Sequence, residues 1–501
     1  MHENHHLAPL TDDTQKCPSL RPLTSRPITA WVSKHVLLIF LLIALLLRMA
    51  IAHFPNVAHP DEIFQTQEPA HRLAYGYGVV TWEWREGIRS WVFPALLAGI
   101  MRVTGWMAAG SSGYVDGITL VLSLISLTTV WFGFQWARNA SGMDAAIIAA
   151  GCCAIWYELA DFGGRALTEV VAAHLLLPGL YLGVYGKEIP ERKRLFLAGI
   201  FCGAALSLRI QLTPAVAFAL LWFCRANWRK RVLPLGAGFV FPIAVFGIVD
   251  FFTWSYPFQS FVRYFWVNAV EGRSRAYGVE PWNWYLLILF EILGPMLLFA
   301  LVGLRRSPFL GGVALIILVS HSALSHKEVR FMYPLIPLVV TLAALGIADI
   351  APKFTLKKEP IPSSRATIAK GLVACCLLSF LLAPRLPYWS KDSGAIIAFD
   401  RLSHDSALCG LGIYALPWYD TGGYTHLHRN VPIVPVLDPS ALARNAAAFN
   451  ALIAPAEVSD LPQGFRLIEC WNGICLHRRS GDCSTPQVRS EINAYLQRTG
   501  N

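Results

Sequence analysis

The sequence predicts a bundle of membrane-spanning helices followed by a smaller part that mixes helices and strands. Of the 501 residues, 55% are hydrophobic and only 15% are charged, which is too little charge for the wetted surface of a soluble protein of this length. No side chain from Val36 to Leu47 carries a polar atom, and a helix that is apolar all round belongs in lipid or in a deep core. Residues 388–501 are more polar and are interrupted by Gly, Pro and Asp.

Twelve segments have the composition of spanning helices, which need about 20 apolar residues, or fewer when neighbouring helices shield them. They are 36–54, 91–105, 115–136, 143–157, 166–185, 195–212, 213–224, 232–250, 284–304, 309–324, 332–350 and 370–387. Basic residues collect in cytoplasmic loops, and the basic loops here are 187–194, 225–231, 305–306 and 353–370. This places 55–90, 251–283, 325–331 and 388–501 outside. Twelve full crossings would return the C-terminus to the inside, so we expect eleven spans, with the irregularity between residues 91 and 137.

The first 35 residues are predicted to be a disordered cytoplasmic tail, because they are polar and rich in proline. His2, His5 and His6 lie in this tail, and a metal site there is the less favoured interpretation. The net charge of +10 would suit nucleic acid in a soluble protein, but here it reflects the basic cytoplasmic loops. We therefore expect no nucleic-acid partner.

Residues 388–501 are expected to form a small mixed α/β domain on the outer side. Cys409, Cys470, Cys475 and Cys483 lie in this region, where disulfides are plausible and three pairings are possible. No pair of cysteines has the spacing of a zinc site, so we expect no metal. The other cysteines in apolar segments are interpreted as small core residues.

The first outer loop, residues 55–90, is unlike a simple connector, because acids, arginines and aromatic residues alternate along it. A helix between Phe64 and Leu73 would lie along the membrane surface. Pro60 suits the first turn of a helix, and Asp61 and Glu62 suit its positive end. An aromatic interfacial belt with arginines on lipid headgroups is the alternative. The carboxylates favour chemistry, because they could deprotonate a hydroxyl.

Several motifs make the chain recognisable. HPDE at His59–Glu62, QEPAH at Gln67–His71, YGYG at Tyr75–Gly78 and TWEWREGIRSWVFP at Thr81–Pro94 resemble the first luminal loop of glycosyltransferase family twenty-two. SHKEVRFMYPLIP at Ser325–Pro337, YGVEPWNWY at Tyr277–Tyr285 and YTHLHRNVPI at Tyr424–Ile433 follow in the order of that family. Its members are the eukaryotic mannosyltransferases of GPI-anchor and N-glycan assembly, with bacterial relatives. Glu280 and Asn283 depart from the pattern, since many members have histidine at these two positions.

The resemblance implies a GT-C type fold, with residues 36–387 as the catalytic membrane domain and the active site at its outer face. It implies transfer of mannose from a polyprenyl- or dolichyl-phosphate donor to a glycan or glycolipid acceptor, with inversion and without a metal or other cofactor. The expected location is the endoplasmic reticulum membrane or a bacterial inner membrane, with the site on the luminal or periplasmic side. The sequence agrees in having no phosphate-binding loop of the nucleotide-binding type.

The candidate catalytic residues are Asp61, as the general base, and Glu62 as its alternative. Neighbouring residues at a helix start point in different directions, so only one of them is expected to face the donor. The candidate donor-phosphate residues are His326, Lys327, Arg330 and Arg209. The candidate acceptor- or sugar-binding residues are His59, Glu83, Trp84, Arg85, Arg89, Tyr277, Trp282 and Trp284. Arg165 and Glu169 are four residues apart and could pair on one helix face.

Two other functions compete with a transferase. A transporter or flippase for a lipid-linked sugar would be expected to show paired repeats and interrupted helices near the middle of the membrane, but no repeat is evident and the acids concentrate in an outer loop. A protein that binds a sugar lipid without catalysis is the second alternative. The intact HPDE and HKEVRF motifs count against it.

Overall fold

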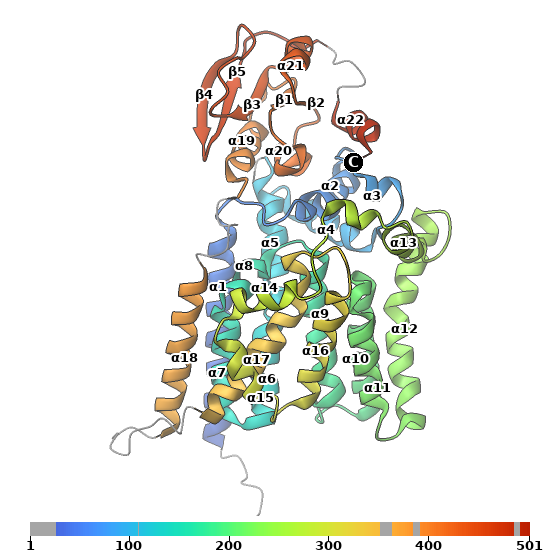
Figure 1. Ribbon diagram of the computed structural model, residues 1–501, viewed down its shortest axis with the longest axis vertical. Helices are drawn as coiled ribbons and strands as arrows, with labels where there is room; N and C mark the ends of the chain where they lie inside the picture. Colours follow the sequence, from blue (N-terminus) through green and yellow to red (C-terminus); the bar gives the residue numbers. More distant parts are fainter. Residues whose placement is uncertain (1–26, 109, 351–362, 384–390, 485–490, 501) are drawn as a thin grey trace, which may run out of the picture.

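The computed structural model describes residues 27–108, 110–350, 363–383, 391–484 and 491–500. Long helices form a bundle, a five-stranded sheet lies at one end of it, and short helices of the first outer loop lie between the two (Figure 1). The predicted architecture, a helical bundle with a small α/β part, is therefore confirmed. The predicted tail is mostly outside the described residues, but helix α1 (Pro27–Ala52) begins before the expected residue 36. The predicted boundary at residue 388 also lies outside them.

Each of the twelve apolar segments contains helix. Besides α1, the helices of the bundle are α4 (Val92–Thr104), α5 (Ser112–Ser126), α6 (Thr128–Ser141), α7 (Met143–Ile155), α8 (Tyr157–Asp161), α9 (Thr168–Val184), α10 (Glu191–Leu208), α11 (Thr213–Cys224), α12 (Trp228–Thr253), α14 (Trp284–Leu293), α15 (Met296–Gly303), α16 (Pro308–Ser322), α17 (Ile336–Ile350) and α18 (Ser363–Leu382). Two pairs of consecutive helical segments are sharply bent, one at the end of the expected span 143–157 and one within the expected span 284–304. Helix α7 and the segment from Tyr157 to Gly164 meet at 59°, and α14 and α15 meet at 101°. At the second bend Gly294 has a φ of 48°, a left-handed conformation that glycine adopts without steric cost.

Four helices among the described residues are long and apolar enough to cross a membrane, and six if each bent pair is one span. Five shorter apolar helices accompany them, among them α4. With 13 residues, α4 is about 20 Å long, which is less than the thickness of the hydrocarbon core. The expectation of eleven spans therefore stays a prediction.

The outer surface of the bundle is apolar. In the helical segment Val329–Ile350, which includes α17, 94% of an 18-residue apolar stretch is buried, whereas only 11% of the stretch His35–Ala52 in α1 is buried. Phe252 on α12 is 78% exposed and Phe380 on α18 is 75% exposed. Large apolar surfaces of this kind are rare on monomeric soluble proteins, and here they match the lipid-facing side of a membrane protein.

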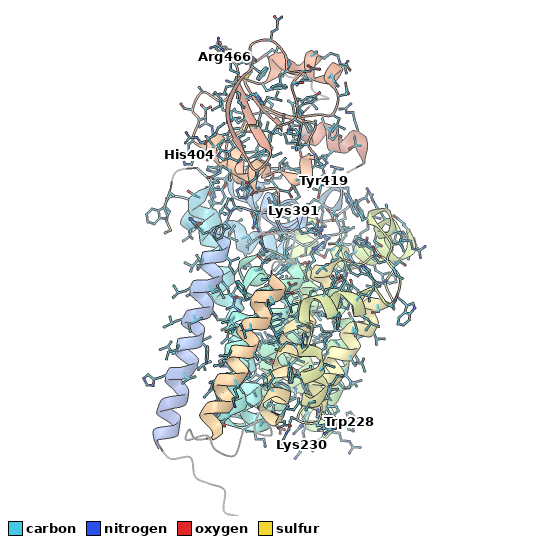
Figure 2. All side chains as sticks on the ribbon, turned by 60° about the vertical axis from the view of Figure 1, so that its left-hand side comes forward. Trp228, Lys230, Lys391, His404, Tyr419 and Arg466 are labelled. Atoms are coloured by element: carbon cyan, nitrogen blue, oxygen red, sulfur yellow. A yellow bond between two sulfur atoms is a disulfide. The ribbon has the colours of Figure 1, made fainter. Side chains whose placement is uncertain are left out.

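The two ends of the bundle differ in character. Trp228 and Lys230, from the basic loop that is predicted to be cytoplasmic, lie at one end (Figure 2). Tyr419 and Arg466, from the C-terminal part, lie toward the other end. The C-terminal part and the basic loop are therefore on opposite sides of the bundle, as the charge distribution predicts.

The first outer loop folds into a short layer on top of the bundle. The helix that begins at Pro60 has a wide π turn, η1 (Glu62–Gln67), and continues as α2 (Glu68–Tyr75), so the helix expected between Phe64 and Leu73 is present. It is followed by α3 (Trp82–Arg85). Buried alanines of α2 contact Phe93 and Leu97 of α4 in one apolar cluster. π turns inside helices occur frequently at functional sites.

The C-terminal sheet has the strand order β2-β1-β3-β5-β4. Strands β1 (Leu411–Tyr414), β2 (Ile433–Val436) and β3 (Ala451–Pro455) are parallel, whereas β5 (Ile474–Arg478) runs antiparallel to β3 and to β4 (Arg466–Trp471). Helix α19 (Ser393–Ser403) packs on it. Of the three possible pairings, the disulfides are Cys409–Cys483 and Cys470–Cys475. Both lie in this part, as expected.

A buried carboxylate joins the C-terminal part to the outer layer. Glu68 is fully buried and accepts hydrogen bonds from Val79 N at 2.6 Å, from Thr425 N at 2.5 Å and from the Thr425 hydroxyl at 2.8 Å. Burial raises the pKa of Glu68 to about 7. Beside it, one ring nitrogen of His71 lies 3.1 Å from Nδ1 of His428. These contacts fix the C-terminal part above the helix that begins at Pro60.

We expect Glu68→Gln to loosen this attachment. The amide has one acceptor oxygen where the carboxylate has two, so the N–H of Val79 or the donors of Thr425 lose a buried partner, at about 1–3 kcal/mol. The thermal midpoint in detergent should fall, and limited proteolysis should cut the C-terminal part sooner. Glu469→Gln, on the exposed strand β4, is the matched control. Equal midpoints for both variants would contradict this role of Glu68.

Candidate active site

A cavity of about 1060 Å³ lies between the outer layer, the top of the bundle and the C-terminal part. It is larger than the pockets that usually hold a drug-sized molecule. Its wall comes from the helix start at His59–Gln65, from the loop at 81–89, from the top of α11, from residues 264–277 and from the turn at 323–331. Trp418 and Tyr419, in η9 (Trp418–Asp420), close it from the C-terminal part.

Of the two neighbouring acids at the helix start, only Asp61 lines this cavity. Its side chain is 22% exposed. Glu62 points away, where its carboxylate lies 3.2 Å from Arg165 and accepts a hydrogen bond from Ala166 N at 3.4 Å. Burial raises the pKa of Glu62, and Arg165 opposes the shift. The geometry therefore favours Asp61 over Glu62 as the acid that can meet a substrate.

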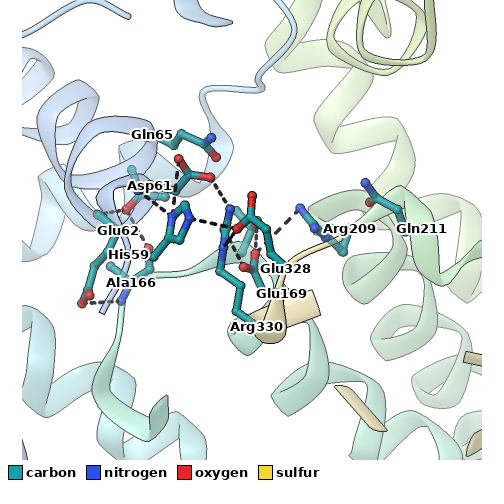
Figure 3. Close-up of polar contacts among 12 residues, drawn as sticks. His59, Asp61, Glu62, Gln65, Ala166, Glu169, Arg209, Gln211, Glu328 and Arg330 are labelled. Carbon is teal, nitrogen blue, oxygen red and sulfur yellow. Dashed lines mark hydrogen bonds and ion pairs between the residues drawn. The ribbon is translucent and has the colours of Figure 1, made fainter. Parts of the chain in front are cut away.

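Arg330 holds three carboxylates at once (Figure 3). Its Nη2 donates to Asp61, its Nη1 donates to Glu169 at 2.6 Å, and its Nε donates to Glu328 at 2.6 Å. Arg330 itself is 5% exposed. A planar guanidinium holds several carboxylates in fixed directions in this way, whereas the donors of a lysine rotate about a single nitrogen. The orientation of Asp61 is therefore set by a residue 269 positions away.

Glu328 is the second centre of the network. It lies 2.9 Å from Nε2 of His59 and 2.8 Å from Nε2 of His326, in addition to its contact with Arg330. These partners hold the pKa of Glu328 well below its usual range, with Arg330 as the largest favourable influence. Nδ1 of His59 accepts the backbone N–H of Asp61 at 3.2 Å. Since Nδ1 of His59 is the acceptor here, Nε2 is the ring nitrogen that donates to Glu328.

Glu169 at the start of α9 connects this network to Arg209. Nη1 of Arg209 lies 3.8 Å from Glu169, and its guanidinium lies 4.3 Å from the ring centre of Phe331. The possible pairing of Arg165 with Glu169 on one helix face is not formed, because Arg165 precedes the helix in an extended conformation and the i,i+4 spacing does not apply. Arg165 instead contacts Asp161 at 2.8 Å and Glu62.

The two other cations of the turn at 325–331 bind backbone carbonyls. Nζ of Lys327 donates to the carbonyls of Glu280 at 2.8 Å and of Leu324. Nδ1 of His326 lies 3.1 Å from the carbonyl of Gly278, and the contact with Glu328 raises the pKa of His326. Glu280, one of the two positions that depart from the family pattern, thus enters the site through its carbonyl. The identity of its side chain does not determine that contact.

The opposite wall carries aromatic and polar groups. The rings of Trp82 and Tyr277 are stacked with centroids 6.1 Å apart. Glu83 accepts hydrogen bonds from Gln65 at 2.6 Å and from Arg89 at 3.2 Å, and burial raises the pKa of Glu83 despite Arg89. This wall combines a flat apolar surface with donors and acceptors, as sugar recognition requires.

Most of the candidate residues are brought together around the large cavity, and some are not. Those in its wall are His59, Asp61, Glu83, Arg89, Arg209, Tyr277, His326, Lys327 and Arg330. Glu62, Trp84, Arg85, Trp282 and Trp284 are outside it. Arg85 donates to the carbonyls of Val80 and Leu496 and so helps to attach the C-terminal part, whereas Trp282 is exposed.

Sequence reasoning did not select Glu328, Gln65, Trp418 and Tyr419 as site residues. Glu328 was recognisable as the single acid among the cations of HKEVRF, since cations so close together need a counter-charge. Gln65 lies one helical turn after Asp61, which was also a usable signal. Trp418 and Tyr419 have no comparable signal, because only the fold brings them near the outer loop.

Comparison with known proteins identifies the family. The profile of the Alg9-like mannosyltransferase family matches residues 38–428. GPI mannosyltransferase 3 of Yarrowia lipolytica is 27% identical over 398 residues, covering 75% of this chain and 72% of that protein. GPI alpha-1,2-mannosyltransferase 3 of Mus musculus is 24% identical and covers 74% of this chain and 68% of that protein.

The fold also has a solved counterpart. The crystal structure of ArnT from Cupriavidus metallidurans bound to undecaprenyl phosphate superimposes with a TM-score of 0.61 at 13% identity, covering 92% of this chain and 100% of that one. The fold is of the GT-C type, as the motifs imply. The chain therefore belongs to the Alg9-like mannosyltransferase family, and it is a membrane glycosyltransferase that transfers mannose.

Proposed function

We propose that this mannosyltransferase takes mannose from a polyprenyl- or dolichyl-phosphate donor and attaches it, with inversion at the anomeric carbon, to a glycan or glycolipid acceptor. The observation that carries the proposal is the position of Asp61. Its carboxylate lines the large cavity and is held in place by Arg330. An oriented carboxylate at the wall of a cavity that can admit the substrates is the arrangement that a general base requires.

The proposed reaction is a single displacement. Asp61 accepts the proton of an acceptor hydroxyl while the oxygen of that hydroxyl bonds to the anomeric carbon of mannose. The bond between that carbon and the phosphate oxygen breaks at the same time, and its electron pair leaves with the polyprenyl phosphate. Attack from the face opposite to the leaving group inverts the anomeric configuration.

The leaving phosphate needs positive charge around it. We assign this role to His326, Lys327 and Arg209, which line the same cavity, together with the charge of Arg330. Nε, Nη1 and Nη2 of Arg330 each donate to a carboxylate. We therefore assign Arg330 mainly to the orientation of Asp61. We propose that the reaction needs no metal and no other cofactor.

The names of the similar proteins support the choice of substrates. ArnT was crystallised with undecaprenyl phosphate, which supports a polyprenyl-phosphate donor. The relatives named GPI mannosyltransferase 3 support a GPI-type glycolipid as the acceptor. The stacked pair Trp82–Tyr277 and the C-terminal pair Trp418–Tyr419 would then face the acceptor sugars. We place this end of the bundle on the luminal side of the endoplasmic reticulum or the periplasmic side of a bacterial inner membrane.

The test is sugar transfer by the purified full chain in detergent. Radiolabelled polyprenyl-phosphate mannose is offered with a panel of mannosides that includes GPI-type glycolipids, and nucleotide-linked mannose is the control donor. We expect a product from the lipid donor alone, with the anomeric configuration opposite to that of the donor by NMR. Transfer from the nucleotide donor, or retention of configuration, would contradict the proposal.

A further inference from the structure

A second cavity, smaller than the first, lies beside it. Its volume is about 70 Å³ and it shares Gln65, Arg89 and Arg209 with the large cavity. One water needs roughly 10–15 Å³ of such volume, so a group of several heavy atoms fits. Of the described residues that line it, Arg89 and Arg209 are charged and none is Asp or Glu. The wall thus carries two guanidinium groups and no carboxylate, whereas Asp61, Glu83 and Glu328 line the large cavity. The carboxylates that pair with the two arginines, Glu83 and Glu169, lie outside the small cavity.

Several buried donors of the residues that line this cavity have no partner among the described residues. They are Nε1 of Trp84, Nε of Arg89, the hydroxyl of Ser90, and both Nε and Nη2 of Arg209. Trp84 is 4% exposed and Arg209 is 5% exposed. A buried donor without a partner is costly, and more so when it is charged, so this many in one small wall calls for a ligand. Indole and guanidinium groups donate only, so the ligand must supply acceptors. A negatively charged acceptor forms the stronger hydrogen bonds with the two guanidinium groups.

Apart from these donors, the lining of the small cavity is part polar and part apolar. The apolar part includes Phe93, Leu208, Phe246 and Phe261. A ligand that satisfies both halves has an anionic group joined directly to hydrocarbon. A phosphate ester of a lipid has this composition, and its oxygens can accept from several donors at once.

We propose that the pocket formed by Trp84, Arg89, Ser90 and Arg209 binds the phosphate ester group of a lipid substrate. The inference rests on the proposed function, because both the lipid-phosphate donor and a phosphate-containing glycolipid acceptor carry this group. Arg209 also contacts Glu169, which contacts Arg330. Because the pocket shares Gln65, Arg89 and Arg209 with the large cavity that Asp61 lines, a phosphate bound there lies beside that cavity.

The experiment removes single donors while keeping the shape of the pocket. Trp84→Phe deletes the indole N–H and Ser90→Ala deletes the hydroxyl. Trp91→Phe is the matched control, since Trp91 packs on Trp84 with ring centres 4.5 Å apart and lies outside both cavities. Three quantities are measured on the full chain in detergent: the KM for polyprenyl-phosphate mannose, the KM for the acceptor, and the affinity for sugar-free polyprenyl phosphate. Thermal unfolding shows whether each variant is folded.

We expect each pocket variant to bind one of the two substrates about 3- to 10-fold more weakly, since a net hydrogen bond is worth roughly 0.5–1.5 kcal/mol. The control variant should have the same KM values and affinity as the native chain. A raised donor KM with weaker binding of polyprenyl phosphate assigns the pocket to the donor. A raised acceptor KM alone assigns it to the acceptor. Folded variants with both KM values and the polyprenyl phosphate affinity unchanged would overturn the inference.

Failure of the proposed function would give a different experimental result from failure of the pocket inference. A native chain that transfers no mannose would count against that function, yet binding of polyprenyl phosphate to the native chain and to Trp84→Phe can still be compared. Binding of a phosphate-containing GPI-type glycolipid is compared in the same way. Weaker binding of either lipid by the variant would then support the pocket. Equal binding of both lipids by the two chains, or binding of neither by the native chain, would overturn the pocket as well.

Discussion

Replacement of Asp61 by asparagine is expected to reduce the transfer of mannose by at least a hundredfold. The amide keeps the size of the side chain and its place in the wall of the cavity, but it cannot accept the proton of the acceptor hydroxyl. General base catalysis contributes about 10²- to 10⁴-fold. The loss should appear in kcat, because the groups assigned to the donor phosphate are unchanged. Initial rates with radiolabelled polyprenyl-phosphate mannose measure it.

The control is Glu86→Gln. Glu86 belongs to the same outer loop, but it is half-exposed and pairs with Arg263 away from Asp61, so its replacement should leave the rate unchanged. Transfer that survives in Asp61→Asn would rule out Asp61 as the base and point to Glu62. That outcome would also require Glu62 to leave its contact with Arg165.

Much of the fold could be predicted because hydropathy determines it. A helix in lipid must satisfy its own backbone and be apolar outside, and each of the twelve apolar segments indeed contains helix. The number of full crossings is harder to predict, because a bent pair such as α14 and α15 has the composition of one span. Composition does not reveal a bend of 101°.

The site was predictable to the extent that it lies in short motifs. Asp61 and Arg330 belong to such motifs, but their contact joins positions 269 residues apart. Which of two adjacent acids faces the cavity depends on the rotation of a helix start, which sequence alone does not give. The pairing of the four outer cysteines and the position of Trp418 depend on how the C-terminal sheet is placed. No local sequence pattern predicts that placement.

The replacement of Arg330 by glutamine is expected to affect stability and activity together. Arg330 is buried and stands between Asp61, Glu169 and Glu328. Its loss leaves three carboxylates facing one another with little solvent, and breaking a buried ion pair typically costs about 3–5 kcal/mol. The thermal midpoint in detergent should fall, and transfer should fall as well, because Asp61 is no longer oriented. Arg330→Lys should be intermediate, since one ammonium cannot reach three carboxylates in a fixed geometry.

Two comparisons separate this effect from general damage. Arg263→Gln breaks the more exposed pair with Glu86, which should cost less than about 1 kcal/mol. The double variant Asp61→Asn/Arg330→Gln should be less destabilised than the sum of the two single variants, because removing Asp61 relieves part of the repulsion that the loss of Arg330 creates. Strict additivity of the two destabilisations would show that the contact between Arg330 and Asp61 contributes nothing to stability. It would then also count against Arg330 as the residue that orients the base.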